Sequence, residues 1–277
     1  MKALRLFSMV VCVSLMPAIA LAQPAKDFKP EVGQQGKDVV WVPTSLALVN
    51  KMLDMAKATP SDYVIDLGSG DGRTVITAAK RGIKALGIEY NPDMVELSKR
   101  AAAKEGVTER ATFIKADLFE TDFSSATVIT MFLLPEINLK LRPKILGLKP
   151  GTRIVSNTFT MGEWDADETG SAASDEGSSY YRTALLWIVP AKVEGAWKWV
   201  NGAAQGDITL KQEFQKVSGS INVGGVSTLV TGGKLRGDQI SFSAGGAQYT
   251  GTVRGNTMAG NVVSGGASRE WRAARPK

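Results

Sequence analysis

The chain of 277 residues carries 33 lysines and arginines against 27 aspartates and glutamates, a formal net charge of +6, and it is 44% apolar, as globular proteins are. It contains no histidine, which excludes a Ser-His-Asp triad, a Cys-His pair, an H-E-x-x-H zinc site and any imidazole base. Its basic residues are spread thinly, with no run interleaved with aromatics, so we predict no nucleic-acid partner.

Residues 1–22 have the pattern of a secretory signal peptide. Lys2 and Arg5 precede an apolar run over 6–22, which ends in an A-x-A cleavage site before Gln23. We therefore expect a periplasmic or secreted protein, with a retained signal segment and membrane association as the alternative. The only cysteine, Cys12, lies within this segment, so the mature chain has no thiol, disulfide or cysteine-bound metal.

A polar arm or linker with several prolines and glycines is predicted over 23–40, and an α/β domain over 41–202. Thr44 is the expected N-cap of a helix over 45–58. Apolar runs typical of buried strands then alternate with helical patterns, which predicts a doubly wound, Rossmann-like parallel sheet with helices on both faces. The strands are expected at 64–67, 84–88, 111–114, 128–134, 152–156 and 184–189, the helices at 74–81, 93–105 and 136–146, and a polar loop at 165–179.

The pattern changes after residue 203. Helical periodicity ends, and short alternating runs recur between Gly-Gly pairs up to residue 277. Evenly spaced short strands with turn signals predict a small all-β antiparallel meander, closed as a barrel or folded as a sandwich. A strand over 197–200 is either the last of the α/β domain or the first of this unit.

The most informative segment is Y-V-I-D-L-G-S-G-D-G-R at 63–73, a buried strand that leads into a glycine turn and a helix. This is the nucleotide-binding corner of a doubly wound fold. The spacing is not G-x-G-x-x-G, and carboxylates next to a pyrophosphate would repel it. S-adenosylmethionine, which has an ammonium group and no phosphate, suits the site better; a dinucleotide or a turn without ligand remain alternatives. The candidate cofactor-binding residues of this segment are Asp66, Gly68, Ser69, Gly70, Asp71 and Gly72.

Two further acids follow the next strands of the predicted sheet. Glu89 ends the second strand, where a carboxylate can accept both ribose hydroxyls, and Asp117 follows the third, where it can accept from the adenine amino group. Asp66 would pair with the methionine ammonium. Carboxyl ends of parallel strands share one edge, so we expect these acids to surround one ligand. No clustered D-x-D-x-D loop appears, and no metal site is predicted.

These motifs resemble those of class I, seven-β-strand methyltransferases, and more narrowly the lysine methyltransferases of the ATP synthase c-subunit and the adenine nucleotide translocase. The similarity runs from Trp41 to Trp164 and includes D-L-G-S-G-D-G-R, the E-Y-N-P of Glu89 to Pro92, Asp117-Leu118-Phe119 and the F-L-L-P of Phe132 to Pro135. The resemblance implies that the glycine loop, Glu89, Asn91, Asp117 and Leu118 hold the cofactor. It also implies that Phe132 and Pro135 border the methyl-acceptor site.

The acceptor implied by this resemblance is a protein lysine, and a small-molecule acceptor is the alternative. Glu136 is the candidate that orients the ammonium or receives its proton; otherwise it is an ordinary acid at a helix N-terminus. Trp41, Phe132 and Trp164 would wall a lysine channel through apolar and cation–π contacts, or else belong to the core. A third hypothesis is a non-catalytic cofactor- or ligand-binding protein whose β-domain carries the function.

Overall fold

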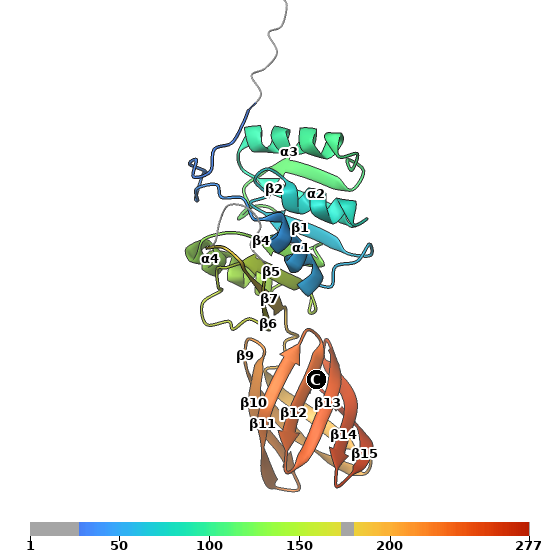
Figure 1. Cartoon of the computed structure of the whole chain (residues 1–277). Helices are drawn as coiled ribbons and strands as arrows, with labels where there is room; N and C mark the ends of the chain where they lie inside the picture. The colour runs from blue at the N-terminus through green and yellow to red at the C-terminus, as the bar shows by residue number, and fades with distance from the viewer. Residues whose placement is uncertain (1–27, 173–179, 277) are drawn as a thin grey trace, which may run out of the picture.

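A computed structural model describes residues 28–172 and 180–276, which form an α/β domain and a β-barrel (Figure 1). The predicted signal peptide and Cys12 lie outside the described residues. Within the described part, no helix is both long and apolar enough to span a membrane. The elements of the α/β domain are α1 (Leu46–Met55), β1 (Tyr63–Leu67), α2 (Arg73–Lys80), β2 (Lys84–Glu89), α3 (Pro92–Lys104), β3 (Ala111–Lys115), β4 (Val128–Met131), α4 (Pro135–Leu146), β5 (Arg153–Asn157), β6 (Glu168–Ser171) and β7 (Thr183–Ile188).

The seven strands form one sheet in the order β3-β2-β1-β4-β5-β7-β6. The first five are parallel, as predicted, whereas β7 runs antiparallel to both β5 and β6, so the sheet is mixed. Alternate residues of the central strands face two separate cores. One core includes Val64 and Val155 and is covered by α1, α2 and α3; the other includes Ile65 and Ile154 and is covered by α4. Helices therefore cover both faces, as a doubly wound fold requires.

Two local predictions in this domain are wrong. The segment predicted as a loop at 165–179 contains β6, an edge strand that pairs with β7. Its residues are polar or small, so it lacks the alternating apolar pattern that marks a strand in a sequence. The first helix is capped by Ser45, whose Oγ accepts from Leu48 N at 3.2 Å. Thr44, the predicted cap, instead accepts from Asn157 Nδ2 at 3.1 Å.

The second domain is a closed eight-stranded antiparallel barrel, which settles the choice between barrel and sandwich. Large side chains fill its interior, among them Trp197, Trp271, Phe242 and Tyr249. Its first strand, Gly195–Asn201, pairs with the second and the last, so the barrel begins before the predicted boundary at 202/203. The strands are β8 (Gly195–Asn201), β9 (Ala204–Glu213), β10 (Lys216–Val223), β11 (Val226–Arg236), β12 (Gln239–Ala244), β13 (Ala247–Arg254), β14 (Thr257–Ser264) and β15 (Ala267–Ala274).

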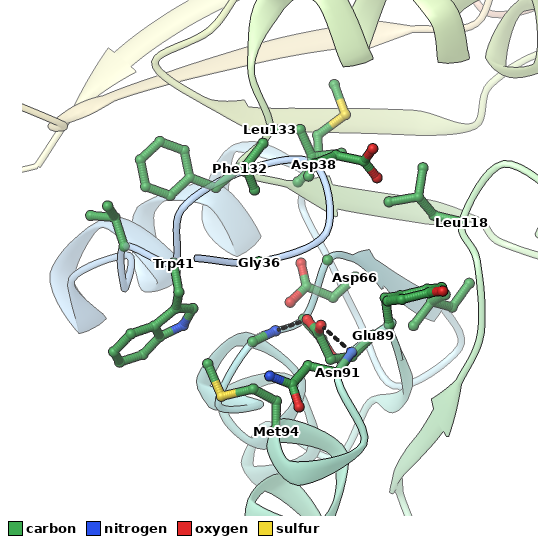
Figure 2. A pocket seen from close by; sticks show the side chains of 18 of the residues that line it. Gly36, Asp38, Trp41, Asp66, Glu89, Asn91, Met94, Leu118, Phe132 and Leu133 are labelled. Carbon is green, nitrogen blue, oxygen red and sulfur yellow. Dashed lines mark hydrogen bonds between the residues drawn. The ribbon is translucent and has the colours of Figure 1, made fainter. Parts of the chain in front are cut away.

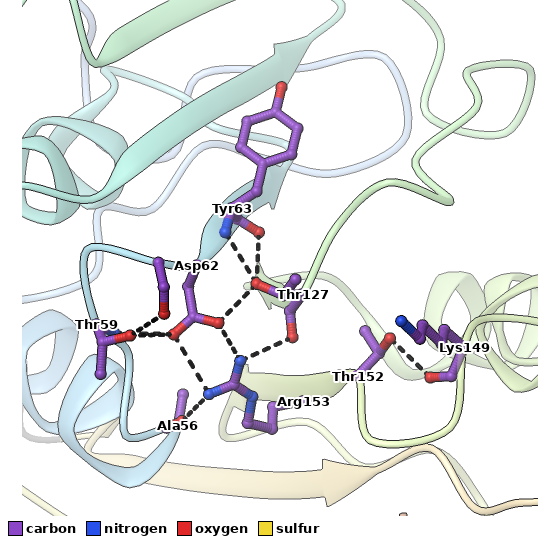
Figure 3. A network of polar contacts seen from close by, with 9 residues as sticks. Ala56, Thr59, Asp62, Tyr63, Thr127, Lys149, Thr152 and Arg153 are labelled. Atoms are coloured by element: carbon purple, nitrogen blue, oxygen red, sulfur yellow. Dashed lines mark hydrogen bonds and ion pairs between the residues drawn. The ribbon is translucent and has the colours of Figure 1, made fainter. Parts of the chain in front are cut away.

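A largely buried polar network joins the amino-terminal ends of the central strands of the α/β domain (Figure 3). The Asp62 carboxylate accepts from Thr127 Oγ1 at 2.8 Å, from Thr59 N at 2.9 Å and from the Arg153 guanidinium, which also donates to Ala56 O at 2.9 Å. Burial raises the pKa of Asp62, but these donors outweigh it and hold that pKa below its usual value. The network links β1, β4 and β5 at their amino-terminal ends. The predicted site residues lie at the opposite, carboxyl ends of the strands.

Candidate functional site

A cavity opens at the carboxyl ends of β1, β2 and β4, where the sequence predicted a ligand (Figure 2). Its floor comes from the β1–α2 turn, and its cover from residues 34–44, of which the sequence marked Trp41 as a candidate for the site. The predicted cofactor residues that line it are Asp66, Gly68, Ser69, Gly70, Asp71, Glu89, Asn91, Asp117 and Leu118.

The glycine turn needs residues without a side chain. Gly68 and Gly70 have φ of +74° and +53°, values that other residues rarely adopt. A Cβ on Gly70 would lie 2.6 Å from the Trp41 indole nitrogen, and one on Gly72 would meet the side chains of Ser98 and Phe113. Gly72 does not line the cavity; its role is close packing of the turn on α3 and β3. The buried Ser69 hydroxyl has no hydrogen-bond partner among the residues that the structure describes.

Asp66 is a buried carboxylate at the floor of the cavity, and its side chain is directed into it in Figure 2. Thr130 Oγ1 donates to its Oδ1 at 2.6 Å. Burial, together with the nearby carboxylates of Asp71 and Glu89, raises the pKa of Asp66 to about 7, against the lowering effect of Thr130. A buried acid with this pKa, unpaired with any cation of the described chain, is suited to bind a cationic ligand group.

Glu89 lies beside the glycine turn and ties it to the second strand. Its Oε2 accepts from Gly70 N and its Oε1 from Asn91 N, each at 2.9 Å (Figure 2). Each oxygen keeps a free lone pair for a further donor. Asn91 itself caps α3, because its Oδ1 accepts from Asp93 N at 2.9 Å.

The arm closes over Asp117 through Lys37. Lys37 Nζ lies 2.5 Å from Asp117 Oδ2 and 4.7 Å from the centre of the Tyr90 ring. The hydrogen bond from Lys37 holds the pKa of Asp117 below its usual value. No sequence signal marks Lys37, since a single lysine in a polar arm has no distinguishing pattern.

The other acid of the glycine turn, Asp71, is also paired within the protein, because Arg73 donates to both of its carboxylate oxygens. Arg73 also donates to Thr44 O at 3.0 Å, so this pair ties the turn to the start of α1. No group of three or more acidic, histidine or cysteine side chains that could hold a metal ion occurs among residues 28–172 and 180–276.

The methyl-acceptor side predicted from the sequence is partly different in the structure. Phe132 lines the cavity and packs against two rings that the sequence did not single out, Phe159 at 5.9 Å and Tyr181 at 5.0 Å between centroids. The ring centroids of Phe159 and Tyr181 are 6.0 Å apart, and both residues line the cavity. Phe132, Phe159 and Tyr181 therefore form an aromatic wall. They come from the ends of β4 and β5 and the start of β7, and lack a common spacing that could have revealed them.

Three predicted acceptor-site residues do not line the cavity. Trp164 is only 1% exposed and belongs to the core beneath α4, where it packs against Trp187. Glu136 is exposed in the first turn of α4, and Pro135 begins that helix. Their neighbours Leu133, Leu134 and Ile137 line the cavity instead, because the chain turns from strand to helix there. Trp41, by contrast, lies at the cavity as predicted.

Comparison with known proteins places this site among methyltransferases. The family model described as ANTKMT methyltransferase domain matches residues 66–168. A protein-lysine N-methyltransferase of Saccharolobus islandicus is 47% identical over 154 residues, which are 54% of this chain and 94% of that protein. The lysine N-methyltransferase of Rattus norvegicus that is named for the ATP synthase c-subunit is 32% identical over 168 residues, 60% of this chain and 71% of that one.

A solved structure of a methyltransferase is also similar to this chain. The crystal structure of an RNA methyltransferase from Salinibacter ruber in complex with S-adenosyl-L-homocysteine is 42% identical, with a TM-score of 0.50, over 55% of this chain and 96% of that chain. The family model ends at residue 168, before the first strand of the barrel.

Proposed function

The chain belongs to the ANTKMT methyltransferase family of S-adenosylmethionine-dependent enzymes, and on this basis we propose that it methylates lysine side chains of a protein. The observation that supports a lysine acceptor is the aromatic wall of Phe132, Phe159 and Tyr181, which lines the same cavity as the donor-side acid Asp66. Aromatic rings attract alkylammonium groups through their negative faces.

The cavity fits S-adenosylmethionine in three places. The buried Asp66 carboxylate would receive the methionine ammonium, Glu89 the ribose hydroxyls and Asp117 the adenine amino group. The glycine turn lets the donor approach the backbone, and the buried Ser69 hydroxyl offers one more polar contact. When bound, the donor supplies a methyl group activated by its sulfonium, so the protein mainly has to hold and orient the two reactants.

The residues on the acceptor side favour a neutral amine. The aromatic wall would attract the ammonium of an entering lysine, and the apolar lining of Leu133, Leu134 and Ile137 would then favour loss of its proton before attack. A neutral amine attacks without a strong base, and the proton of the methylated product is then lost to solvent at the mouth. This agrees with a chain that contains no histidine.

An RNA acceptor is less well supported. Lys37 and Arg73 are the basic side chains that line the cavity, and each is already paired with a carboxylate. Neither is free to neutralise a phosphate, which nucleic-acid binding requires. A small-molecule acceptor is the remaining alternative.

The test is methyl transfer from labelled S-adenosylmethionine into three fractions of a cell extract: proteins, RNA and small molecules. We expect label in protein, on lysine-containing peptides in mass spectrometry. The matched control is Phe159→Ala, which should lose transfer and retain S-adenosylhomocysteine binding. Label confined to RNA or to small molecules would overturn the lysine assignment.

We further propose that the enzyme acts outside the cytoplasm or at a membrane surface, on the evidence of the signal-like pattern of residues 1–22. The mass of the purified mature chain tests this: cleavage after Ala22 supports a secreted form, and an intact N-terminus in the membrane fraction supports an anchor. An intact chain found in the cytoplasm would refute both.

A further inference from the structure

The barrel contacts the methyltransferase domain through several segments, and three of its basic side chains face one short stretch of that domain, residues 165–168. Lys216 pairs with Asp165 at 2.6 Å, and Arg236 pairs with Glu168. Lys234 lies 3.7 Å from the buried carboxylate of Asp167. Three barrel cations therefore face three acids within four residues of the other domain, so opposite charges meet at this part of the junction.

Phe214, in the turn between β9 and β10, is the apolar centre of this junction. Its ring stacks on Trp164, with 6.0 Å between centroids and 12° between planes, and the Arg142 guanidinium lies 5.3 Å from its centre. Phe214 has a φ of +52°, which a bulky residue rarely adopts. Because the turn itself disfavours phenylalanine, the contacts across the junction must favour this ring.

The residues that hold Phe214 also hold the backbone next to the aromatic wall. Arg142 Nη1 donates to Met161 O at 2.8 Å. One helical turn earlier, the buried Asn138 donates from Nδ2 to the carbonyls of Phe159 and Thr160 at 3.3 and 3.1 Å. Helix α4 thus fixes the backbone from 159 to 161, and Phe214 rests on both Arg142 and Trp164. A continuous chain of contacts runs from the barrel to Phe159.

We infer that Phe214 is a positioning residue for the aromatic wall, and that the barrel supports the acceptor side of the methyltransferase domain. The barrel acts through Arg142 and Trp164 on the segment that carries Phe159, and Phe159 in turn packs on Tyr181. The donor side, built from the β1–α2 turn and β2, lies outside this chain of contacts. That the aromatic wall is the acceptor site rests on the proposed function. That the position of the wall depends on Phe214 does not rest on it.

The test uses the full chain labelled with 3-fluorotyrosine, in which the ¹⁹F resonance of Tyr181 reports the packing of the wall. Tyr181→Phe assigns this resonance. The main variant is Phe214→Asn, because asparagine tolerates a positive φ and should keep the barrel turn while it removes the ring. Leu229→Asn is the matched control, since Leu229 is 72% exposed on the barrel strand β11.

We expect Phe214→Asn to move and broaden the Tyr181 resonance, with the dissociation constant of S-adenosylhomocysteine within about twofold of the parent value. In Phe214→Trp, which keeps an aromatic ring at this position, the Tyr181 resonance should have the shift and width of the parent protein. In Leu229→Asn it should also be unchanged. With a methyl-accepting substrate in hand, the same variant should raise KM for the acceptor without raising KM for the donor.

Arg142→Met provides a second route, because it removes the link from the methyltransferase side and leaves the barrel sequence intact. It should move the Tyr181 resonance in the same way, and the double variant should add little. If Phe214→Asn does not fold, the Tyr181 resonance of Arg142→Met tests the inference in its place. An unchanged Tyr181 resonance in a folded Phe214→Asn or in Arg142→Met would overturn the inference, as would an equal change in Leu229→Asn. Because this readout needs no acceptor, its failure is separate from a failure of the lysine assignment.

Discussion

The affinity for S-adenosylhomocysteine should rise with pH through neutrality, because its ammonium group would bind the ionised form of Asp66. Burial raises the pKa of this carboxyl to about 7 in the ligand-free protein. Only the ionised fraction binds well, and the apparent dissociation constant scales inversely with that fraction. The fraction rises from about one tenth at pH 6 to about nine tenths at pH 8, so affinity should rise about tenfold over this range.

Isothermal titration calorimetry in buffers of different ionisation enthalpy measures both parts of this prediction. At pH 6 binding should release close to one proton, and at pH 8 almost none. Asp66→Asn should bind about ten to a hundred times more weakly at pH 8, as expected for a lost hydrogen bond to a charged group, and should show no pH dependence from this site. The matched ligand is 5′-methylthioadenosine, which lacks the ammonium and should show the same affinity at both pH values.

The same pKa has a consequence for the ligand-free fold. A carboxyl whose pKa is raised on folding favours the folded state at low pH, and this contribution is lost as the pH rises from about 4 towards and through 7. The rise of the Asp66 pKa to about 7 corresponds to about 4 kcal/mol of unfolding free energy as an upper bound. Asp66→Asn should therefore raise the free energy of unfolding of the apo protein at pH 8 and not at pH 4. An affinity that is flat or falls from pH 6 to pH 8, together with no proton release, would refute the placement of the ammonium at Asp66.

Three further predictions concern other parts of the molecule. Glu89→Ala should weaken S-adenosylhomocysteine binding by about 1–3 kcal/mol in calorimetry, because the ribose loses a charged acceptor; unchanged affinity would remove Glu89 from the site. Gly70→Ala should abolish binding and lower the melting temperature, since its Cβ would lie 2.6 Å from Trp41 at a φ of +53°; a variant that binds normally would contradict the close approach. Arg153→Met should lower the free energy of unfolding in urea by about 3 kcal/mol, because it leaves the largely buried Asp62 carboxylate without its cation. Adding Asp62→Leu to the same chain should recover part of that loss. No recovery would argue against charge burial as the cause.

The donor side of the site could be predicted from the sequence because its residues follow a topological rule. Parallel strands end at a common edge, so Asp66, Glu89 and Asp117 had to converge once the strands were recognised. The glycine turn could also be predicted, because the positive φ values at Gly68 and Gly70 favour glycine at those two positions.

The acceptor side could not be predicted in the same way, because it is assembled from distant segments. Phe159 and Tyr181 come together only when β7 pairs with β5, and Lys37 reaches Asp117 only when the arm folds back over the cavity. Trp164 stood within the region of family resemblance but is held in the core by contacts with Trp187 and with Phe214 of the barrel. A tryptophan in a sequence does not reveal whether tertiary packing will bury it or leave it beside a ligand.

The alternation of strands in the barrel separates its turns into two sets. The turns at Phe214 and Gly237 contact the methyltransferase domain, and the intervening hairpins at Gly224-Gly225, Gly245-Gly246 and Gly265-Gly266 point away from it (Figure 1). A Cβ on Gly224, Gly225, Gly246, Gly265 or Gly266 would meet no atom of the described residues within 4 Å. Because these glycines have φ between +56° and +84°, a fluorophore, a short affinity tag or a surface tether is best inserted between them rather than put in their place. An insertion there would leave the cavity of the methyltransferase domain unobstructed.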